Sequence, residues 1–323
     1  MYLLEFDEIY KEVIWGGNSL YASYFKPFDK NKTIGESWEI SDLPDYSSIV
    51  SNGVFKGKTL SCLVKEFGKE LLGTKCKKNY FPLLIKLIDS KDKLSIQVHP
   101  DEEYALRKHN KHGKNEMWYI LDSSKDSRLL IGLKENISKE DLKKALDNKD
   151  IIENKFNYFS IKRGDAFFIP SGCIHAILGD VILAEIQTLS DITYRLYDWN
   201  RTDKEGKCRE LHIEDAFNVI KNIDAFSLKS NKKNKFKNEK LEINNLFSNE
   251  YFTAEECIIN QDFFSNTDKE SFHIIIAVEG IGVIKSDSNN IKLHNGKTVL
   301  IPAGLGNYSI TTDDAVKILR VYL

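Results

Sequence analysis

A turn that ends in a histidine carries the strongest chemical signal in this sequence. Residues 164–175 read GDAFFIPSGCIH, in which an apolar strand runs into a Pro/Gly turn that fixes the backbone and holds the imidazole of His175 at the strand end. Upstream, Gln97 and His99 are two residues apart and share one face of a strand, and Glu116 lies further along the chain. One amide oxygen, two imidazoles and one carboxylate form a ligand set that suits Zn²⁺ with water in an open position.

The same segments resemble known sequence motifs. The spacing around His175 is similar to the second cupin motif, and Gln97-x-His99 with Glu116 is similar to a variant of the first. Longer strings resemble type I mannose-6-phosphate isomerases in their short bacterial form, and they span residues 10 to 215. These strings are WGG at 15–17, GESWE at 35–39, PLLIK at 82–86, LSIQVHP at 94–100, GKNEM at 113–117 and SDITYRLYDWNR at 190–201.

This resemblance implies a metal-dependent aldose–ketose isomerase. Such an enzyme interconverts mannose 6-phosphate and fructose 6-phosphate by moving a proton between C2 and C1 through an enediol. The resemblance further implies one Zn²⁺ per chain, bound by Gln97, His99, Glu116 and His175. The reaction requires stabilisation of negative charge on the carbonyl oxygen, a base, and a pocket that holds the phosphate.

Five polar residues match site positions of the family. The expected catalytic residues are Arg195, Lys86, Lys114 and Glu185, and the expected substrate-binding residues are Ser95, Lys86 and Arg195. Lys86 interrupts an apolar strand, where an unpaired charge would be costly, unless it snorkels from a strand end. Glu185 is either the base or a partner that orients a Lys or Arg. Arg195 has a structural alternative, which is to cap a barrel edge.

Several residues of the same chemical types have a simpler interpretation. Gln97 is an uncommon zinc ligand, and a role as a hydrogen-bond donor behind the metal stays open. His109 and His112 lie in a polar run that predicts a solvated loop, and Cys173 is expected to be a small apolar filler. For the four tryptophans, core packing is at least as well supported as lining of a sugar pocket; these are Trp15, Trp38, Trp118 and Trp199.

Four ligands that converge from separate strands suit an antiparallel barrel, whose inward side chains line one pocket. We therefore predict a mainly β protein with two cupin-like antiparallel β-barrel or sandwich (jelly-roll) domains and a few helices. Residues 1–228 form the metal-binding domain, the Lys/Asn-rich residues 229–240 a linker or loop, and residues 241–323 a degenerate domain without metal ligands. In the last of these, residues 296–304 repeat the G-x5-P-x-G spacing, but Asn307 stands at the histidine position.

Hydrophobic periodicity predicts the elements that carry these residues. Strands are expected over 81–88, 94–98, 117–121, 129–131, 158–161, 166–169 and 181–187, and helices over 58–73, from 100, over 138–146 and over 212–223. Residues 138–141, SKED, resemble a capping box with Asp in place of Glu and start the helix over 138–146. Residues 13–57 are turn-rich and only loosely periodic.

Bulk properties limit the remaining function classes. A net charge of −2 gives no basis for nucleic-acid binding, no apolar run suits a membrane span, and five scattered cysteines with an acidic amino terminus predict a cytoplasmic protein. The expected partner is a phosphosugar, and monomer and homodimer stay open. Alternatives are an isomerase for another phosphosugar such as glucose 6-phosphate, a non-catalytic metal-containing sugar-phosphate sensor, and an iron oxygenase, against which the glutamine ligand argues.

Overall fold

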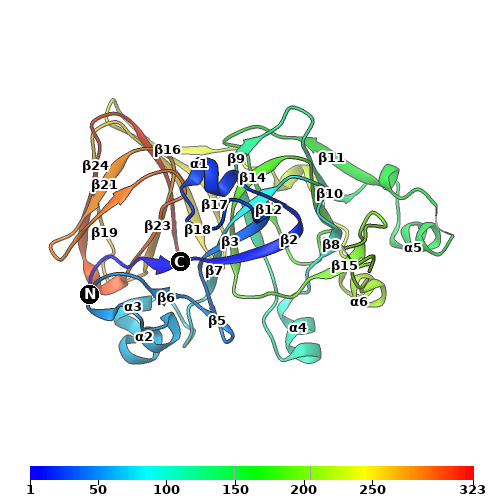
Figure 1. Cartoon of the computed structure of the whole chain (residues 1–323), viewed down its shortest axis with the longest axis horizontal. Helices are drawn as coiled ribbons and strands as arrows, with labels where there is room; N and C mark the ends of the chain where they lie inside the picture. Colours follow the sequence, from blue (N-terminus) through cyan, green and yellow to red (C-terminus); the bar gives the residue numbers. More distant parts are fainter. Residues whose placement is uncertain (149, 204) are drawn as a thin grey trace.

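Two pairs of antiparallel sheets form two β-sandwich domains that lie side by side (Figure 1). The computed structural model describes residues 1–148, 150–203 and 205–323. Its mainly β architecture confirms the predicted fold class. Among the described residues, no helix combines the length and apolar character needed to cross a bilayer.

The first domain pairs a six-stranded sheet with a five-stranded sheet. The six-stranded sheet has the spatial order β12 (Ala166–Ile169), β9 (Glu116–Ser123), β14 (Val181–Thr188), β7 (Leu83–Ser90), β2 (Ile9–Gly17) and β3 (Ile34–Ile40). The five-stranded sheet has the order β11 (Phe156–Ser160), β10 (Arg128–Leu133), β13 (His175–Leu178), β8 (Ile96–Val98) and β15 (Tyr194–Tyr197). Inward side chains of both sheets, among them Trp118, Ile131 and Ile177, share one apolar cluster.

The second domain pairs a six-stranded sheet with a four-stranded sheet. The larger sheet has the order β16 (Lys233–Lys237), β17 (Leu241–Ser248), β18 (Thr253–Ile259), β25 (Val316–Tyr322), β20 (His273–Gly280) and β23 (Thr298–Ile301). The smaller sheet has the order β19 (Asp262–Asn266), β24 (Asn307–Thr311), β21 (Gly282–Lys285) and β22 (Asn290–Leu293). Two small ribbons complete the described strands, β1 (Phe6–Asp7) with β6 (Ile49–Val50) and β4 (Asp42–Leu43) with β5 (Tyr46–Ser47).

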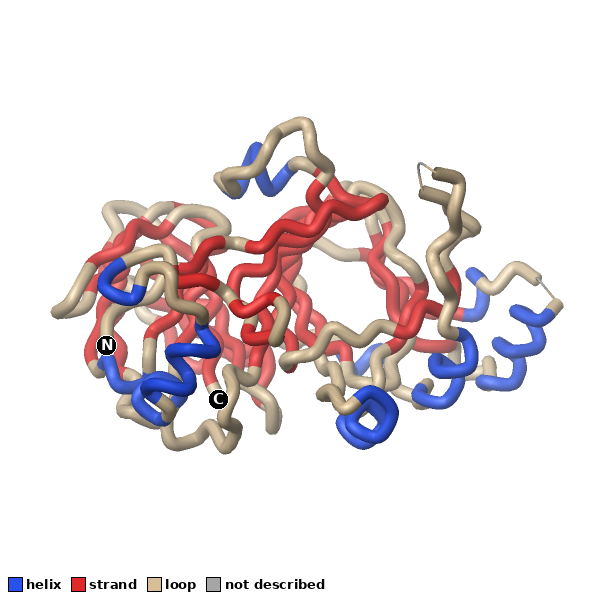
Figure 2. Tube along the Cα trace, turned by 60° about the horizontal axis from the view of Figure 1, so that its bottom comes forward, coloured by secondary structure: helices blue, strands red, loops and turns tan. Residues whose placement is uncertain are grey.

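Short helices lie outside the sheets at the ends and edges of the domains (Figure 2). They are α1 (Ser19–Tyr24), α2 (Leu60–Phe67), α3 (Lys69–Leu72), α4 (Glu102–His109), α5 (Lys139–Asp147) and α6 (Ile213–Val219). The predicted capping box of α5 is confirmed, since the Ser138 hydroxyl accepts from the Asp141 N–H and the Asp141 carboxylate accepts from the Ser138 N–H. The segment 58–73, predicted as one helix, is divided at Gly68, whose φ is +48°.

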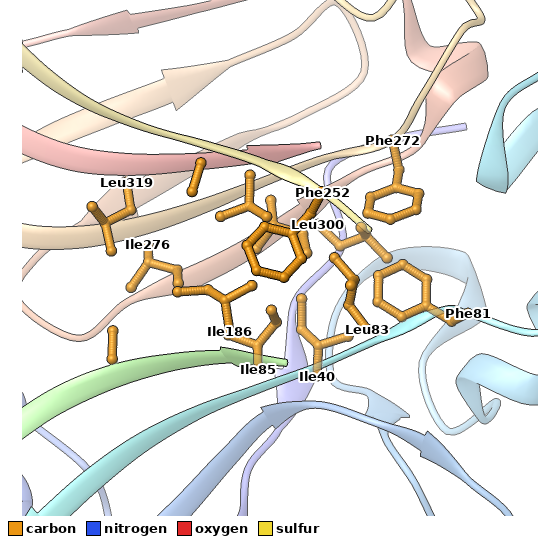
Figure 3. Packing of buried hydrophobic residues seen from close by; sticks show 14 of the residues in the cluster. Ile40, Phe81, Leu83, Ile85, Ile186, Phe252, Phe272, Ile276, Leu300 and Leu319 are labelled. Atoms are coloured by element: carbon orange, nitrogen blue, oxygen red, sulfur yellow. The ribbon is translucent and has the colours of Figure 1, made fainter. Parts of the chain in front are cut away.

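Strand β7 shows how the six-stranded sheet of the first domain is buried on both faces. Leu83 and Ile85 point toward the second domain and join the interdomain core with Phe252 and Phe272 (Figure 3). Alternation in a strand then turns Lys86 to the opposite face, which is the interior of the first barrel. Burial of β7 on both faces thus explains both its apolar run and its single inward-facing lysine.

Three predictions made from the sequence need correction. Residues 229–240 are not only a linker, because Lys233–Lys237 form the edge strand β16 paired with β17. Its lysines find acidic partners on neighbouring strands: Lys235 pairs with Glu255 at 2.6 Å. The turn-rich segment 13–57 contains most of β2 and all of β3. The first residues of the chain, placed in the domain 1–228, reach the second domain, where Leu4 and Leu300 exchange backbone hydrogen bonds.

Candidate metal centre

Cross-strand pairing brings two of the predicted ligands together in the five-stranded sheet. His175 opens β13 and pairs directly with Gln97 of β8, and Gln97 pairs on its other side with Arg195 of β15. Directly opposed residues in antiparallel strands project to the same face, so these three side chains form one row toward the barrel interior. The Gln97 amide nitrogen lies 3.2 Å from Nε2 of His175.

The opposite sheet supplies the carboxylate. Glu116 opens β9 and is fully buried. Its Oε1 lies 3.3 Å from Nε2 of His175, and its Oε2 lies 3.5 Å from Nε2 of His99, which comes directly after β8. One ligating atom of each of these three residues lies within 4.8 Å of the other two. The structure therefore gathers residues from separate strands into a space suited to one metal ion.

The two imidazoles are oriented to offer their Nε2 lone pairs. Nδ1 of His99 lies 2.9 Å from the carbonyl of Ile192, and Nδ1 of His175 lies 2.9 Å from the carbonyl of Cys173. Because a carbonyl only accepts, the proton is assigned to Nδ1 in each ring, which leaves Nε2 free to bind a metal. Nε2 of His99 and Oε1 of Glu116 are buried without a hydrogen-bond partner, as expected for ligands of an ion.

The electrostatic surroundings set the protonation states that metal ligands need. Burial and the nearby Lys114 ammonium lower the pKa of His99 to about 3, and burial also lowers the pKa of His175. Burial alone would raise the pKa of Glu116, but the charge of Lys114 and the contact with His99 outweigh it, and this pKa stays well below its ordinary value. At neutral pH the site thus presents two neutral imidazoles and one carboxylate.

Gln97 and Ser95 occupy the wall beside this cluster. Ser95 is buried, and its hydroxyl donates to Oε1 of Gln97 over 3.3 Å. In this orientation the amide nitrogen faces His175. For Gln97 to bind a metal, its oxygen would have to occupy the position of this nitrogen. The positions of oxygen and nitrogen in a side-chain amide are assigned from the hydrogen bonds around them.

A charged network continues from Glu116 across the interior. Lys114, itself buried, holds its Nζ 2.9 Å from Oε2 of Glu116 and 3.9 Å from Oε1 of Glu185. Glu185 in turn lies 3.0 Å from Nζ of Lys86, which also contacts Glu36 at 3.4 Å. Burial would lower the pKa of Lys86, but the charges of Glu185 and Glu36 raise it above its ordinary value. Lys86 is therefore a buried, paired ammonium and not a lysine that snorkels from a strand end.

Arg195 lies on the edge strand of the same interior row. Its NH1 group donates to the Glu210 carbonyl over 2.7 Å, whereas its Nε is buried without a partner. Burial, followed by the neighbouring Arg209, lowers the pKa of Arg195. The NH1 group thus links the loop at Glu210 to the edge of the sheet, as in the structural alternative considered for Arg195. The Nε donor has no such contact and is available for a ligand.

The structure keeps other residues of suitable type out of the cluster. His109 contacts the Tyr194 hydroxyl, and His112 contacts Glu102. Cys173 is buried and burial raises the pKa of its thiol to about 12, which fits an apolar filler. Trp15 packs in the apolar core, and the Trp199 indole donates to the Leu94 carbonyl.

Three participants were missed from the sequence. Glu36 was noted only within GESWE, yet it contacts Lys86. The indoles of Trp38 and Trp118 donate to Glu36 and Glu185 over 2.7 and 3.0 Å. The i, i+2 spacing of Glu36 and Trp38 was the available signal, because it places both on one face of a strand.

Two family models match this chain. The model of the phosphomannose isomerase type I catalytic domain matches residues 3–140. The model of the mannose-6-phosphate isomerase cupin domain matches residues 242–323. The two matched regions lie in the two β-sandwich domains.

Individual proteins are similar over most of their length. A putative mannose-6-phosphate isomerase of Bacillus subtilis is 35% identical over 305 residues, 94% of this chain and 93% of the relative. The mannose-6-phosphate isomerase of Streptococcus mutans is 41% identical over 207 residues, 64% of each chain. A crystal structure of the mannose 6-phosphate isomerase from Bacillus subtilis superposes with a TM-score of 0.89 at 32% identity and covers 100% of both chains.

Proposed function

The chain belongs to the family of type I phosphomannose isomerases, and we propose that its first barrel interconverts mannose 6-phosphate and fructose 6-phosphate with one bound Zn²⁺. The observation that carries this function is the adjacency of two clusters in one interior. The cluster His99, Glu116 and His175 suits a metal, and the buried network of Lys86, Lys114 and Glu185 lies directly beside it.

His99, Glu116 and His175, with Gln97 as a fourth ligand, would hold the metal. Two neutral imidazoles, a carboxylate and an amide oxygen suit Zn²⁺ and leave room for a further ligand. The unpartnered Nε2 of His99 and the unpartnered Oε1 of Glu116 support this assignment. When bound, the metal supplies a Lewis acid that polarises oxygen atoms of the substrate.

The cationic residues stabilise the negative charges of the substrate, which are the developing oxyanion and the phosphate. Lys86 and Lys114 provide buried ammonium groups for the oxyanion that develops as a proton leaves carbon. Arg195, with a free Nε donor, and Ser95 bind substrate oxygens, and the guanidinium serves either the phosphate or the enediolate. Holding the phosphate fixes C1 and C2 relative to these groups.

Between the two roles considered for Glu185, the contacts favour orientation of a cation. One carboxylate oxygen contacts the Lys86 ammonium at 3.0 Å, and the other accepts from the Trp118 indole at 3.0 Å. A carboxylate held on both oxygens is a poor carrier for a proton from carbon, because protonation would break these contacts.

The test is a direct turnover assay with the metal-loaded protein. Mannose 6-phosphate should yield fructose 6-phosphate, and in D₂O the product should acquire deuterium at C1 if an enediol exchanges its proton with solvent. Glucose 6-phosphate serves as the parallel substrate and should react far more slowly. Protein that binds metal and mannose 6-phosphate without turnover would instead be a sensor, and preference for glucose 6-phosphate would reassign the substrate.

A further inference from the structure

Four side chains from four strands form a continuous row across the interior of the first barrel. Trp38 of β3 pairs with Lys86 of β7, Lys86 pairs with Glu185 of β14, and Glu185 pairs with Trp118 of β9. Direct cross-strand pairs project to one face, so the row places the lysine and the glutamate between two indoles. All four side chains are buried.

Each indole fixes one carboxylate that contacts the same lysine. The Trp38 N–H donates to Oε2 of Glu36 over 2.7 Å, and this same oxygen lies 3.4 Å from Nζ of Lys86. The Trp118 N–H donates to Oε2 of Glu185 over 3.0 Å, and the other oxygen of Glu185 lies 3.0 Å from Nζ of Lys86. Each carboxylate thus contacts both an indole N–H and the Lys86 ammonium.

This arrangement limits where the ammonium can point. A lysine ammonium carries three donors and rotates freely on a flexible stem unless its partners are fixed. The carboxylates of Glu36 and Glu185 can accept two of the three donors of Nζ, which leaves one donor for a substrate oxygen. An indole has only one donor and two torsions, so a buried Trp holds its carboxylate partner with little freedom.

We propose that Trp38 and Trp118 are positioning residues that act through Glu36 and Glu185 to hold the Lys86 ammonium in its working orientation. The inference rests on the proposed isomerase function, in which Lys86 faces the reacting sugar. Neither tryptophan needs to touch the sugar, so truncating the donor should lower kcat and leave KM nearly unchanged.

The test uses the Trp38→Phe and Trp118→Phe variants, which keep an aromatic ring and remove the N–H. Loss of a hydrogen bond to a charged group predicts a fall in kcat of roughly tenfold to a hundredfold in each. The metal content should stay at one ion per chain, and KM should stay within about twofold of the wild-type value.

Tyr119→Phe is the matched control. Tyr119 is the next residue of β9, it is equally buried, and its hydroxyl donates to another buried carboxylate, Glu256, on the opposite face. This variant removes the same kind of contact from the same strand, so it should lose stability and keep kcat. A comparable fall in kcat in Tyr119→Phe would show that damage to the strand explains the result and would overturn the proposal.

Two further measurements keep the inference testable if one variant folds poorly. In a double-mutant cycle, the effect of Trp38→Phe should largely vanish in the Glu36→Gln background, because the indole acts through that carboxylate. Full additivity would overturn the proposal. Kinetics within twofold of wild type in both Trp variants, or loss of the metal from them, would overturn it as well.

Indole N–H signals in NMR spectra separate this inference from the isomerase function itself. Glu36→Gln should shift the Trp38 signal, Glu185→Gln should shift the Trp118 signal, and neither change needs turnover. Wild-type protein that turns over no phosphosugar but shows these shifts would refute the proposed function while the hydrogen-bonded row stands. Unshifted signals in an active enzyme would refute the row alone.

Discussion

Lys86 and Glu185 are direct cross-strand neighbours on β7 and β14, and their charged ends meet 3.0 Å apart inside the first barrel. The second barrel also has a cross-strand pair of one acidic and one basic residue, with the two charges exchanged between the strands. Glu255 of β18 pairs directly with Arg320 of β25, and the carboxylate and guanidinium are in contact there as well. The interior of the second domain thus keeps a buried ion pair at the corresponding place in its larger sheet.

The correspondence between the domains extends to the metal positions. Gln97 pairs with His175 in the first barrel, whereas Asn266 pairs with Asn307 in the second. Glu116 opens β9, and its counterpart at the start of β20 is His273. Among the described residues, the only group of histidines, cysteines and carboxylates that meets the geometry of a metal site is the one in the first barrel.

Metal removal should therefore abolish activity at a single site. We expect chelation to remove one ion per chain and Zn²⁺ to restore turnover, because His99 and His175 belong to one site and the described part of the second barrel has no matching ligands. His99→Ala and His175→Ala should lose the ion, whereas His109→Ala should keep it. Elemental analysis checks both points, and full activity in protein without stoichiometric metal would contradict the assignment.

Breaking the Lys86–Glu185 pair should cost more stability than any exposed pair. Lys86→Met leaves the buried carboxylate of Glu185 and the partly buried carboxylate of Glu36 facing an apolar side chain, so we expect the free energy of unfolding to fall by about 3–5 kcal/mol. Adding Glu185→Gln should recover part of this loss without restoring turnover. Urea unfolding and the isomerase assay give the two readouts.

Lys91→Met provides the matched control for this prediction. Lys91 and Asp180 connect the ends of the same two strands at 2.6 Å, but both side chains are more than 40% exposed. We expect its effect to stay below about 1 kcal/mol, because solvent screens an exposed pair. Equal losses in Lys86→Met and Lys91→Met would contradict the structural importance of the buried pair.

Arg195→Lys should fold, retain the metal and lose activity. A lysine carries the charge but not the planar fork of donors, so we expect a fall in kcat/KM of roughly a hundredfold or more. A fall mainly in kcat would indicate contact with the enediolate, and a rise mainly in KM would indicate contact with the phosphate. The control is Arg128→Lys, at the exposed first residue of β10. Wild-type kinetics in Arg195→Lys would leave Arg195 with only its contact to Glu210.

His273 should make the stability of the protein fall in mild acid. Burial, followed by the charge of Arg320, lowers its pKa to about 3 in the folded state, whereas an unfolded histidine titrates near 6.5. Between these values the unfolded chain binds the extra proton, so the stabilisation is complete above pH 6.5 and decreases as the pH falls toward 3. Between pH 7.5 and pH 5.0, protonation of this one residue in the unfolded chain lowers the free energy of unfolding by about 2 kcal/mol.

His273→Asn tests the sign of this effect. Urea unfolding at pH 7.5 and 5.0 should show a smaller loss of stability in the variant than in the wild type, because asparagine has no proton to gain. The variant should also lose some stability at both pH values, since the ring nitrogen Nδ1 now contacts the Tyr308 hydroxyl at 2.8 Å. Equal pH dependence in the two proteins would contradict the prediction.

Features whose geometry is local could be predicted from the sequence. Residues two apart on a strand share one face, and a Pro/Gly turn fixes the direction of the residues that follow. Spacing, together with the resemblance to cupin motifs, therefore grouped Gln97, His99 and His175 as candidate ligands. The same reasoning found the repeat in the second domain and the loss of its histidine at Asn307. Helix α5 was predicted from a capping box that needs only four consecutive residues.

Which strands lie next to each other depends on the folded structure and could not be predicted. The pairing of Lys86 with Glu185, and the contacts of Glu36 and two tryptophans with that pair, join residues from four strands that are far apart in the sequence. Residues 229–240 were predicted as a linker or loop because the partners of β16 also lie far away in the sequence. Strand β16 has the sequence KNKFK, without apolar alternation, and its lysines pair with Glu242 and Glu255 of other strands in the folded sheet. When two residues meet only through folding, neither sequence segment shows a hydrophobic periodicity that would reveal the contact.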